Sequence, residues 1–264
     1  MTNPVLDCLR NHRSIRRFTK DPIEERVLST LLDAGTRAAT AGNLQMYSFL
    51  VVDDPPKIAL FEEHIGGAGI PPLIVIALVD LHRIKRWLEV SDANPPVLGR
   101  PVYFLLGFWD AIIALQNVVV AAESLGLGGC YYGAILEFDT QKHFGTPEYV
   151  FPAGMVCLGY PAEEPQLSQR LPLEAIVHRN SYREFSDEEI KEFYHERERV
   201  WDRVSEKRKS LLAEKGIHSI PQALAVQRFS DDITRQRTEG IRRNLKCSKF
   251  TFDMVRQSQM ASDE

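Results

Sequence analysis

The sequence predicts a three-layer α/β fold with a helical extension at its carboxyl end. The run 73–79 is apolar without polar alternation, which is typical of a strand that is covered on both faces. Segments with helical periodicity flank this run, and the composition shifts to charged helix from Asp187 onward. A central sheet between helices, followed by solvated helices, satisfies these observations.

Helices and strands are expected to alternate before the core strand. Apolar residues recur on one face of the second helix, and β-branched and aromatic residues indicate the first strand. The expected elements are helices over 5–11, from Asp21-Pro22 to Gly42-Asn43 and over 57–64, with a strand over 48–52.

The most apolar long stretch, 102–125, is expected to form a buried helix. Asp110 and Glu123 interrupt it, and its uncharged run 111–122 is shorter than the roughly 20 apolar residues that a bilayer requires, so we expect no membrane association. A helix that is apolar on most sides is buried in a core or in a subunit interface. This pattern is compatible with a dimer.

Two more strands and two charged helices are expected after this helix. The intervening loop contains three prolines, and the last helices carry charges on most sides. The expected elements are strands over 130–135 and 154–159, a charged helix from 187 and a second solvated helix over 231–243.

Composition excludes several classes of protein. The 264 residues carry a formal net charge of -4, which is unlike the basic surface of a nucleic-acid-binding domain. The amino terminus lacks the basic start and apolar core of a secretory signal, so a cytoplasmic location is expected. The four cysteines are far apart without zinc-ligand spacing and are expected to be reduced thiols, the middle two in apolar surroundings: Cys8, Cys130, Cys157 and Cys247.

An arginine cluster at 12–18 is the main candidate for a binding site. Arginine presents its donors as a rigid fork that suits phosphate oxygens, and Ser14 adds a neutral donor. By themselves these residues are better explained by a solvated turn, where arginines are ordinary. Gly126, Gly128 and Gly129 follow a helix and precede a strand, the reverse of a dinucleotide-binding turn. Motifs of phosphate loops, serine hydrolases and zinc proteases are absent.

Four segments, in order, resemble the FMN-dependent nitroreductase family, and two later ones resemble its NADPH-preferring, oxygen-insensitive branch, which is similar to bacterial flavin reductases. The likeness covers roughly residues 5–200. The first four are His-Arg-Ser-Ile-Arg-Arg-Phe at 12–18, Ala-Ala-Thr-Ala-Gly-Asn-Leu-Gln-Met-Tyr-Ser-Phe at 38–49, Ala-Ala-Glu-Ser-Leu-Gly-Leu-Gly-Gly-Cys-Tyr-Tyr-Gly-Ala-Ile at 121–135 and Cys-Leu-Gly-Tyr-Pro-Ala-Glu-Glu-Pro at 157–165; the later two are Arg-Leu-Pro at 170–172 and Val-His-Arg-Asn-Ser-Tyr at 177–182.

The resemblance implies a mostly antiparallel central sheet and a homodimer with flavin sites at the subunit interface. It also implies an FMN-binding domain over 1–200 and a helical, dimer-associated extension over 201–264. The implied FMN contacts are His12, Arg13, Ser14, Arg16, Thr40, Asn43, Gln45, Tyr131, Tyr132, Gly133, Ala134 and Arg170.

These contacts carry different expected roles. Arg13, Ser14 and Arg170 are expected at the phosphate and ribityl chain, and Arg16 at the pyrimidine edge, where negative charge accumulates on reduction. Thr40, Asn43 and Gln45 are expected to reach the flavin from the facing subunit. The segment Tyr131, Tyr132, Gly133 and Ala134 is expected near N5, where Gly133 permits close approach; strand packing is an open alternative for both tyrosines.

Two departures and a divergent tail qualify the likeness. Ala68 stands where related flavin reductases carry a ring-contacting glutamine, and Ser168 stands where a phosphate-binding lysine is common. The tail after about residue 210 does not resemble the branch closely. Arginines 197, 199 and 203 are candidates for the NADPH phosphate, although a solvated basic helix face explains them equally well.

The implied function is an FMN oxidoreductase that takes hydride from NADPH or NADH and reduces a nitroaromatic, quinone or free flavin by a ping-pong mechanism. Such chemistry depends on positioning over the ring, so no catalytic acid, base or metal is expected in the protein. The alternative is a flavin carrier or redox sensor with little turnover, which the substitutions at Ala68 and Ser168 favour.

Overall fold

The computed structural model describes residues 3–65, 69–93 and 98–252. The chain forms two compact units, one made of residues 1–166 and 239–264 and the other of residues 167–238. These units are defined by packing. The expected division into an FMN-binding domain over 1–200 and an extension over 201–264 concerns binding and stays a prediction.

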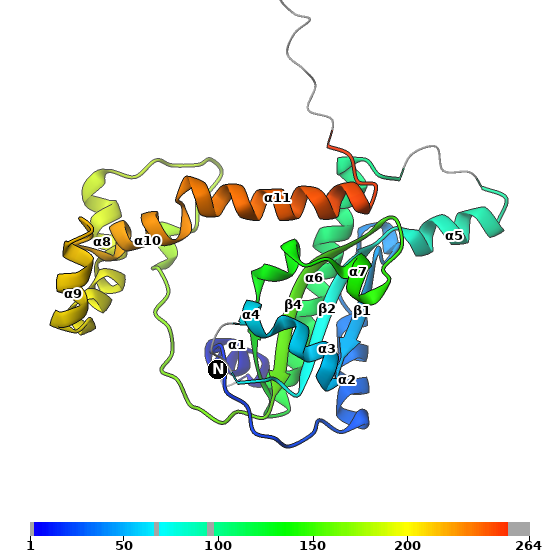
Figure 1. Ribbon diagram of the computed structural model, residues 1–264, viewed down its shortest axis with the longest axis horizontal. Coiled ribbons are helices and arrows are strands. Elements are labelled where there is room, and N and C mark those ends of the chain that lie inside the picture. The colour runs from blue at the N-terminus through cyan, green and yellow to red at the C-terminus, as the bar shows by residue number, and fades with distance from the viewer. Residues whose placement is uncertain (1–2, 66–68, 94–97, 253–264) are drawn as a thin grey trace, which may run out of the picture. The chain divides into compact units, whose positions relative to one another are not determined.

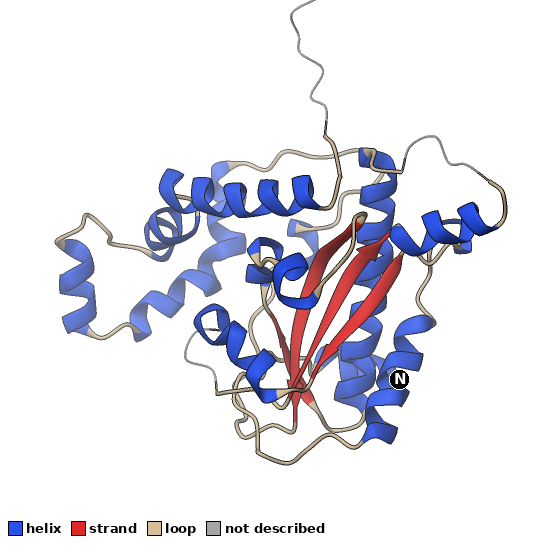
Figure 2. Ribbon diagram, turned by 45° about the vertical axis from the view of Figure 1, so that its right-hand side comes forward, coloured by secondary structure: helices blue, strands red, loops and turns tan. Residues whose placement is uncertain are grey.

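A four-stranded antiparallel sheet is the centre of the first unit (Figures 1 and 2). Its order is β1 (Tyr47–Val52), β2 (Leu73–Asp80), β4 (Val150–Gly159) and β3 (Gly128–Tyr131). Every residue of β4 is buried, as is every residue of β2 except the terminal aspartate. The predicted fold class, an antiparallel sheet flanked by helices, is confirmed.

Helices precede, connect and follow these strands. The α-helices are α1 (Pro4–Arg10), α2 (Glu25–Thr36), α3 (Pro55–Ile58), α4 (Glu62–Ile65), α5 (His82–Val90), α6 (Pro101–Ser124), α7 (Thr140–Phe144), α8 (Asp187–Glu198), α9 (Glu206–Ala213), α10 (Ile220–Arg228) and α11 (Asp231–Cys247). The 3₁₀ helices are η1 (Ala41–Asn43), η2 (Ala59–Phe61), η3 (Gly133–Glu137), η4 (Leu173–Ala175) and η5 (Arg199–Arg203).

The predicted strand over 130–135 is wrong in its bounds. Pairing with β4 begins at Gly128 and stops at Tyr131, opposite Val156, because the chain then turns into η3. Apolar side chains continue through this turn because Ile135 packs into the core, so the apolar run outlasts the strand. Helices α5 and α10 are not predicted from the sequence, since their apolar patterns are short, whereas α9 lies in the charged helical region expected from 187 onward.

Separate hydrophobic clusters cover the two faces of the sheet. One contains buried residues of α2 and α6 with Val75, Ala77 and Val79 of β2. The other contains Ile74 and Ile76 of β2 and buried residues of α3, η2, α4 and η3. Alternate residues of a strand point to opposite faces, so a strand apolar at every position needs both coverings.

Helix α6 is long and apolar enough to span a membrane by composition, since its mean hydropathy reaches 1.8 over 18 residues. In the structure it packs against the sheet and α2, and nine of its residues are buried. Its opposite side carries an exposed apolar stripe that consists of Val102, Leu105, Trp109 and Ile113. A core helix with one uncovered apolar face accounts for the composition of this segment.

A buried carboxylate on α6 organises the loop that leads into β1. Asp110 is 3% exposed, and its two oxygens accept the backbone N–H groups of Ala41 at 2.9 Å and Met46 at 3.2 Å. One side chain therefore closes both ends of the segment 41–46. The charge that interrupts the apolar helix has this structural role.

Replacing Asp110 by Ala is expected to lower the free energy of unfolding by about 3 kcal/mol, because two N–H groups lose a charged acceptor in a poorly hydrated place. Urea unfolding followed by circular dichroism measures the change. The control is Asp33→Ala on α2, whose side chain is 71% exposed and pairs with Arg37 at 3.7 Å. Its expected effect is below about 1 kcal/mol. Equal losses in both variants would contradict the structural role of Asp110.

Candidate functional site

The arginine cluster runs as an extended segment beside the sheet. Ser14 pairs with Gly129 of β3, and the Ile15 N–H donates to the Gly129 carbonyl at 2.9 Å. Ile15 is 5% exposed, and a Cβ at Gly128 would lie 2.4 Å from its side chain. Burial of Ile15 places its neighbours on the outer side, since side chains alternate along extended backbone. Arg16 is accordingly exposed.

Glu163 holds the backbone of this segment from the other side. Its Oε1 accepts the N–H groups of Arg16 at 2.7 Å and Arg17 at 3.0 Å. The N–H of Arg16, then that of Arg17, and both guanidinium charges hold the pKa of Glu163 below its ordinary value. Among the described residues, no hydrogen bond or ion pair engages the Arg16 guanidinium. The backbone is anchored while this positive group remains available to an anion.

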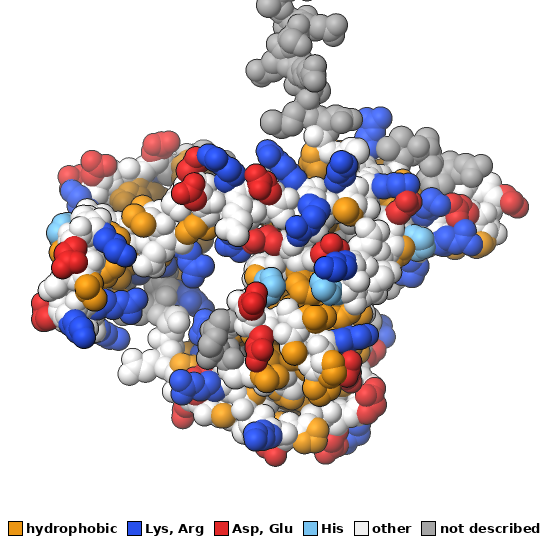
Figure 3. Space-filling view, in the orientation of Figure 1, with side chains coloured by type: hydrophobic (Ala, Val, Ile, Leu, Met, Phe, Trp, Pro, Cys, Tyr) orange, Lys and Arg blue, Asp and Glu red, His pale blue; other side chains and the backbone are white. Residues whose placement is uncertain are grey.

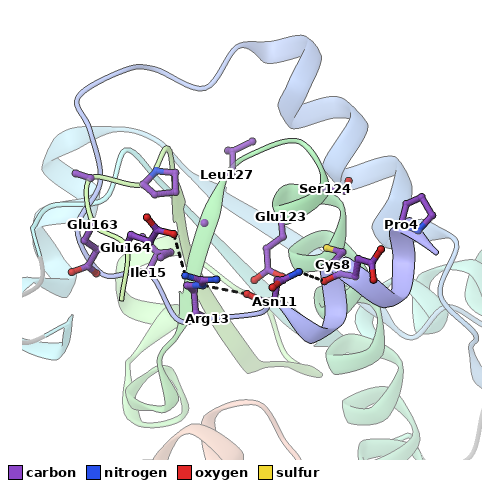
Figure 4. A pocket seen from close by; sticks show the side chains of 14 residues that line it. Pro4, Cys8, Asn11, Arg13, Ile15, Glu123, Ser124, Leu127, Glu163 and Glu164 are labelled. Carbon is purple, nitrogen blue, oxygen red and sulfur yellow. Dashed lines mark hydrogen bonds and ion pairs between the residues drawn. The ribbon is translucent and has the colours of Figure 1, made fainter. Parts of the chain in front are cut away.

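Arg13 lies in an open pocket of about 870 Å³ (Figure 4). The pocket is lined by α1, the end of α6 and the 161–164 loop. The Arg13 guanidinium donates to the Pro165 carbonyl at 3.2 Å and lies 3.5 Å from the Glu164 carboxylate. Glu164 is 89% exposed, so an incoming phosphate can replace this weak partner at little cost.

His12 is oriented by a residue that sequence reasoning did not single out. Its Nδ1 lies 2.6 Å from Oε1 of Glu123, whose side chain is 14% exposed. A carboxylate only accepts, so Nδ1 carries the proton and Nε2 is left for another partner. Cys8 lines the pocket that contains Arg13. Burial is the main cause that raises the pKa of Cys8, and the charge of Glu123 is the second. In the sequence, Glu123 stands out only as an interruption of the apolar helix.

The segment that contains Tyr131 and Tyr132 lies beside Arg16. The Tyr131 hydroxyl lies 3.2 Å from Oε1 of Gln116 on α6, and the Tyr132 N–H donates to Met155 at 3.0 Å. Burial raises the pKa of Tyr132, and the nearby Arg16 guanidinium opposes that shift. After Tyr132 the chain continues to Gly133, which is exposed, and Ala134, which is half-buried. The structure thus brings together the first and third predicted segments.

The predicted residues Asn43 and Gln45 lie on the loop that Asp110 holds. Both are exposed, with left-handed φ angles of 55° and 51°, and Thr40 directly precedes η1. Arg83, another residue that the sequence did not indicate, donates to the carbonyl of Gln45 and, at 2.9 Å, to that of Tyr47. The strained backbone is therefore held by two charged side chains.

These two groups of residues lie beside different parts of α6, one near its middle and the other at its carboxyl end. Asp110 holds the 41–46 loop and Glu123 holds His12, thirteen residues further along the helix, or about 20 Å at 1.5 Å per residue. Within one chain the loop residues do not meet the arginine cluster. Arg170 and Ser168 are exposed in the second unit, so their approach to the cluster stays a prediction, and Ala68 lies outside the described residues.

The donor set of the cluster suits an organic phosphate rather than a metal ion. Arginine forks, a serine hydroxyl and an oriented histidine supply hydrogen-bond donors and positive charge. Within the residues that the structure describes, no group of three or more His, Cys, Asp or Glu side chains is arranged to hold a metal ion. The arrangement can bind an anionic ligand and stabilise negative charge beside Tyr132.

Comparison with known proteins identifies the family. Residues 9–160 match the model of the nitroreductase family. An oxygen-insensitive NADPH nitroreductase of Salmonella typhimurium is 32% identical over 73% of this chain and 83% of that protein. An FMN reductase (NADPH) of Bacillus subtilis is 32% identical over 70% of this chain and 77% of that protein.

The solved structure of NfrA2 from B. megaterium has the same fold, with a TM-score of 0.80 and 27% identity. The likeness covers 96% of this chain and all of that one. The family model and the identities point to one conclusion, which confirms the resemblance seen in the motifs: the chain belongs to the nitroreductase family.

Proposed function

We propose that the protein is an FMN-dependent NAD(P)H oxidoreductase that reduces nitroaromatics, quinones or free flavins. The observation that carries the proposal is the Arg16 guanidinium, which has no side-chain partner among the described residues and lies beside Tyr132 in a chain of the nitroreductase family. A positive charge next to an approachable backbone segment suits a flavin ring, because it stabilises the negative charge that the ring gains on reduction.

The residues present fit FMN. Arg13 lies in a pocket of about 870 Å³ that Asp7, Glu123 and Glu163 also line, and its own carboxylate partner Glu164 is exposed and replaceable. Gly133 is exposed and leaves room for close approach of a ring to the backbone. The phosphate can therefore bind near Arg13 while the ring lies near Arg16 and Gly133.

When bound, FMN supplies a ring that accepts hydride from NAD(P)H and passes two electrons to a second substrate. The residues of the chain bind FMN and orient it. Arg13, Ser14 and Arg170 hold the phosphate and ribityl chain, Arg16 supplies positive charge at the ring edge, and Glu123 fixes the orientation of His12. We assign no protein group as catalytic acid or base, because the reaction depends on placing the two substrates over one ring.

We further propose that two copies of the chain build each flavin site. The exposed stripe of Val102, Leu105, Trp109 and Ile113 runs along α6, which also connects the two separated groups of site residues. An antiparallel pair of α6 helices buries both stripes in a two-fold interface. The likeness to the nitroreductase family implies that in this dimer the 41–46 loop of one copy lies near the arginine cluster of its partner. Thr40, Asn43 and Gln45 then complete a site that one chain leaves incomplete.

The second unit supplies the candidates for coenzyme binding. Arg197 lies on α8, and Arg199 and Arg203 lie on η5; Arg199 is 3.2 Å from Glu196. We retain 201–264 as an extension associated with the dimer and 1–200 as the FMN-binding part. The four free cysteines, two of them buried, fit a reducing compartment, so a cytoplasmic location belongs to this proposal.

The first prediction of this proposal concerns the colour of the protein. Protein loaded with FMN under anaerobic conditions is expected to bleach when NADPH or NADH is added, and a nitroaromatic or quinone is expected to restore the absorbance. The comparison of the two coenzymes gives their preference. Flavin that binds but stays oxidised with either coenzyme would favour a carrier or sensor, and lack of FMN binding would contradict the proposal.

The second prediction tests Arg16. Arg16→Ala is expected to raise the FMN dissociation constant about tenfold, which corresponds to roughly 1.4 kcal/mol for a lost charge contact. Arg17→Ala is the matched control, because both residues are exposed and both donate backbone N–H groups to Glu163. Quenching of FMN fluorescence measures the affinity. Similar dissociation constants for the two variants would remove Arg16 from the site.

The third prediction tests the dimer. Trp109 is 59% exposed on the α6 stripe, and Trp109→Glu is expected to convert a dimer into monomers that bind FMN at least about tenfold more weakly, since charge at an apolar interface is costly. Sedimentation velocity and FMN titration measure both effects. Trp87→Glu makes the same change at a residue on α5 that is 57% exposed, and it should leave the dimer intact. A dimer that survives Trp109→Glu with full affinity would contradict the shared site.

A further inference from the structure

The final turns of α11 approach the turn η3 closely. Gly240 and Asn244 are buried, and both belong to the same compact unit as η3. A Cβ at Gly240 would lie 2.9 Å from the Cβ of Glu137, so the helix can approach the turn this closely only because residue 240 has no side chain. The outer side of α11 carries basic and acidic side chains (Figure 3), as expected of a solvated helix, while Gly240 and Asn244 are buried.

Two adjacent side chains of α11 donate to three consecutive carbonyls of the turn. The Asn244 amide donates to Leu136 at 2.8 Å and to Phe138 at 2.9 Å, and Asn244 is 6% exposed. The Arg243 guanidinium donates to the carbonyl of Glu137 at 2.6 Å. Carbonyls at the end of a helix lack partners within it, so donors from α11 can bind them there. The Phe138 carbonyl also accepts the Thr140 N–H at 3.0 Å.

The chain that follows α11 fixes the helix to the sheet. The Ser248 hydroxyl donates to the Val150 carbonyl of β4 at 2.6 Å, and the Tyr149 N–H donates to Ser248 at 2.9 Å. The Phe250 ring packs on Phe104 of α6 with 4.9 Å between centroids. The donors at 243 and 244 are therefore held at a set place relative to the strands, and through them so is η3.

We propose that Gly240, Arg243 and Asn244 are positioning residues for the flavin site. They hold the turn from its far end, so that Tyr132, Gly133 and Ala134 at its near end keep one place beside Arg16. The inference rests on the proposed function, because it assigns a purpose to the turn only if FMN lies against residues 132–134. Binding that depends on ring placement is sensitive to small shifts of the supporting backbone.

A role in stability alone makes a different prediction. It would change the free energy of unfolding and leave the affinity of the folded protein for FMN as it was. A positioning role changes the affinity, and the surroundings of the bound ring, in protein that remains folded. Arg243 separates the two roles well, because it is exposed and its removal leaves no cavity.

The test compares Arg243→Ala with Arg242→Ala in the full chain loaded with FMN. Both residues are exposed arginines of α11, and the described residues contain no hydrogen-bond or ion-pair partner for Arg242. Arg243→Ala is expected to raise the FMN dissociation constant roughly fivefold, the equivalent of one net hydrogen bond, and to change the visible circular dichroism of bound FMN. Arg242→Ala should change neither. Arg243→Lys, which keeps a donor, should restore most of the affinity.

A second variant approaches the same contact by sterics. Gly240→Ala places a methyl group against Glu137 and is expected to weaken FMN binding in the same direction. Equal FMN affinities and flavin spectra for the unchanged protein, Arg243→Ala and Arg242→Ala would overturn the positioning role. Failure of the unchanged protein to bind FMN would instead overturn the proposed function, so the two failures are distinguishable.

Discussion

The need to bury α6 against the sheet is the constraint on which the rest of the first unit depends. The helix packs on β2 and β4 with one face and leaves the stripe of Val102, Leu105, Trp109 and Ile113 on the other. Because it runs nearly the length of the sheet, it also sets the distance between the two groups of site residues. A single helix thereby determines the core, the proposed interface and the need for a second copy at each site.

Three carboxylates hold the segments that carry the candidate site residues. Asp110 closes the 41–46 loop, Glu123 orients His12, and Glu163 anchors the backbone of the arginine cluster. In the last case the acid binds N–H groups and leaves the Arg16 guanidinium to an incoming anion. Glu163 and Glu123 thus lie near the anion site without pairing with the Arg16 guanidinium, because Glu163 binds backbone donors and Glu123 binds histidine.

The sequence was informative where one physical signal dominated. The apolar run of β2 predicted a doubly covered strand, and it is buried on both faces. The segment after Gly129 was less clear, since apolar character continues past Tyr131 although strand pairing ends there. Asp110 and Arg83 illustrate the limit at the site: each binds backbone groups that are distant in the chain, and no local pattern marks such long-range hydrogen bonds.

By itself, the sequence determined the fold class, the arginine cluster and the likeness to nitroreductases, because periodicity and motifs are local properties of the chain. Only the tertiary structure decided that residues 12–16 and 131–134 lie together, that the loop of Asn43 and Gln45 lies elsewhere, and that Arg243 and Asn244 support η3. Those relations depend on which backbone groups find partners when the sheet and α6 pack. Packing joins residues a hundred positions apart, and no local pattern carries that information.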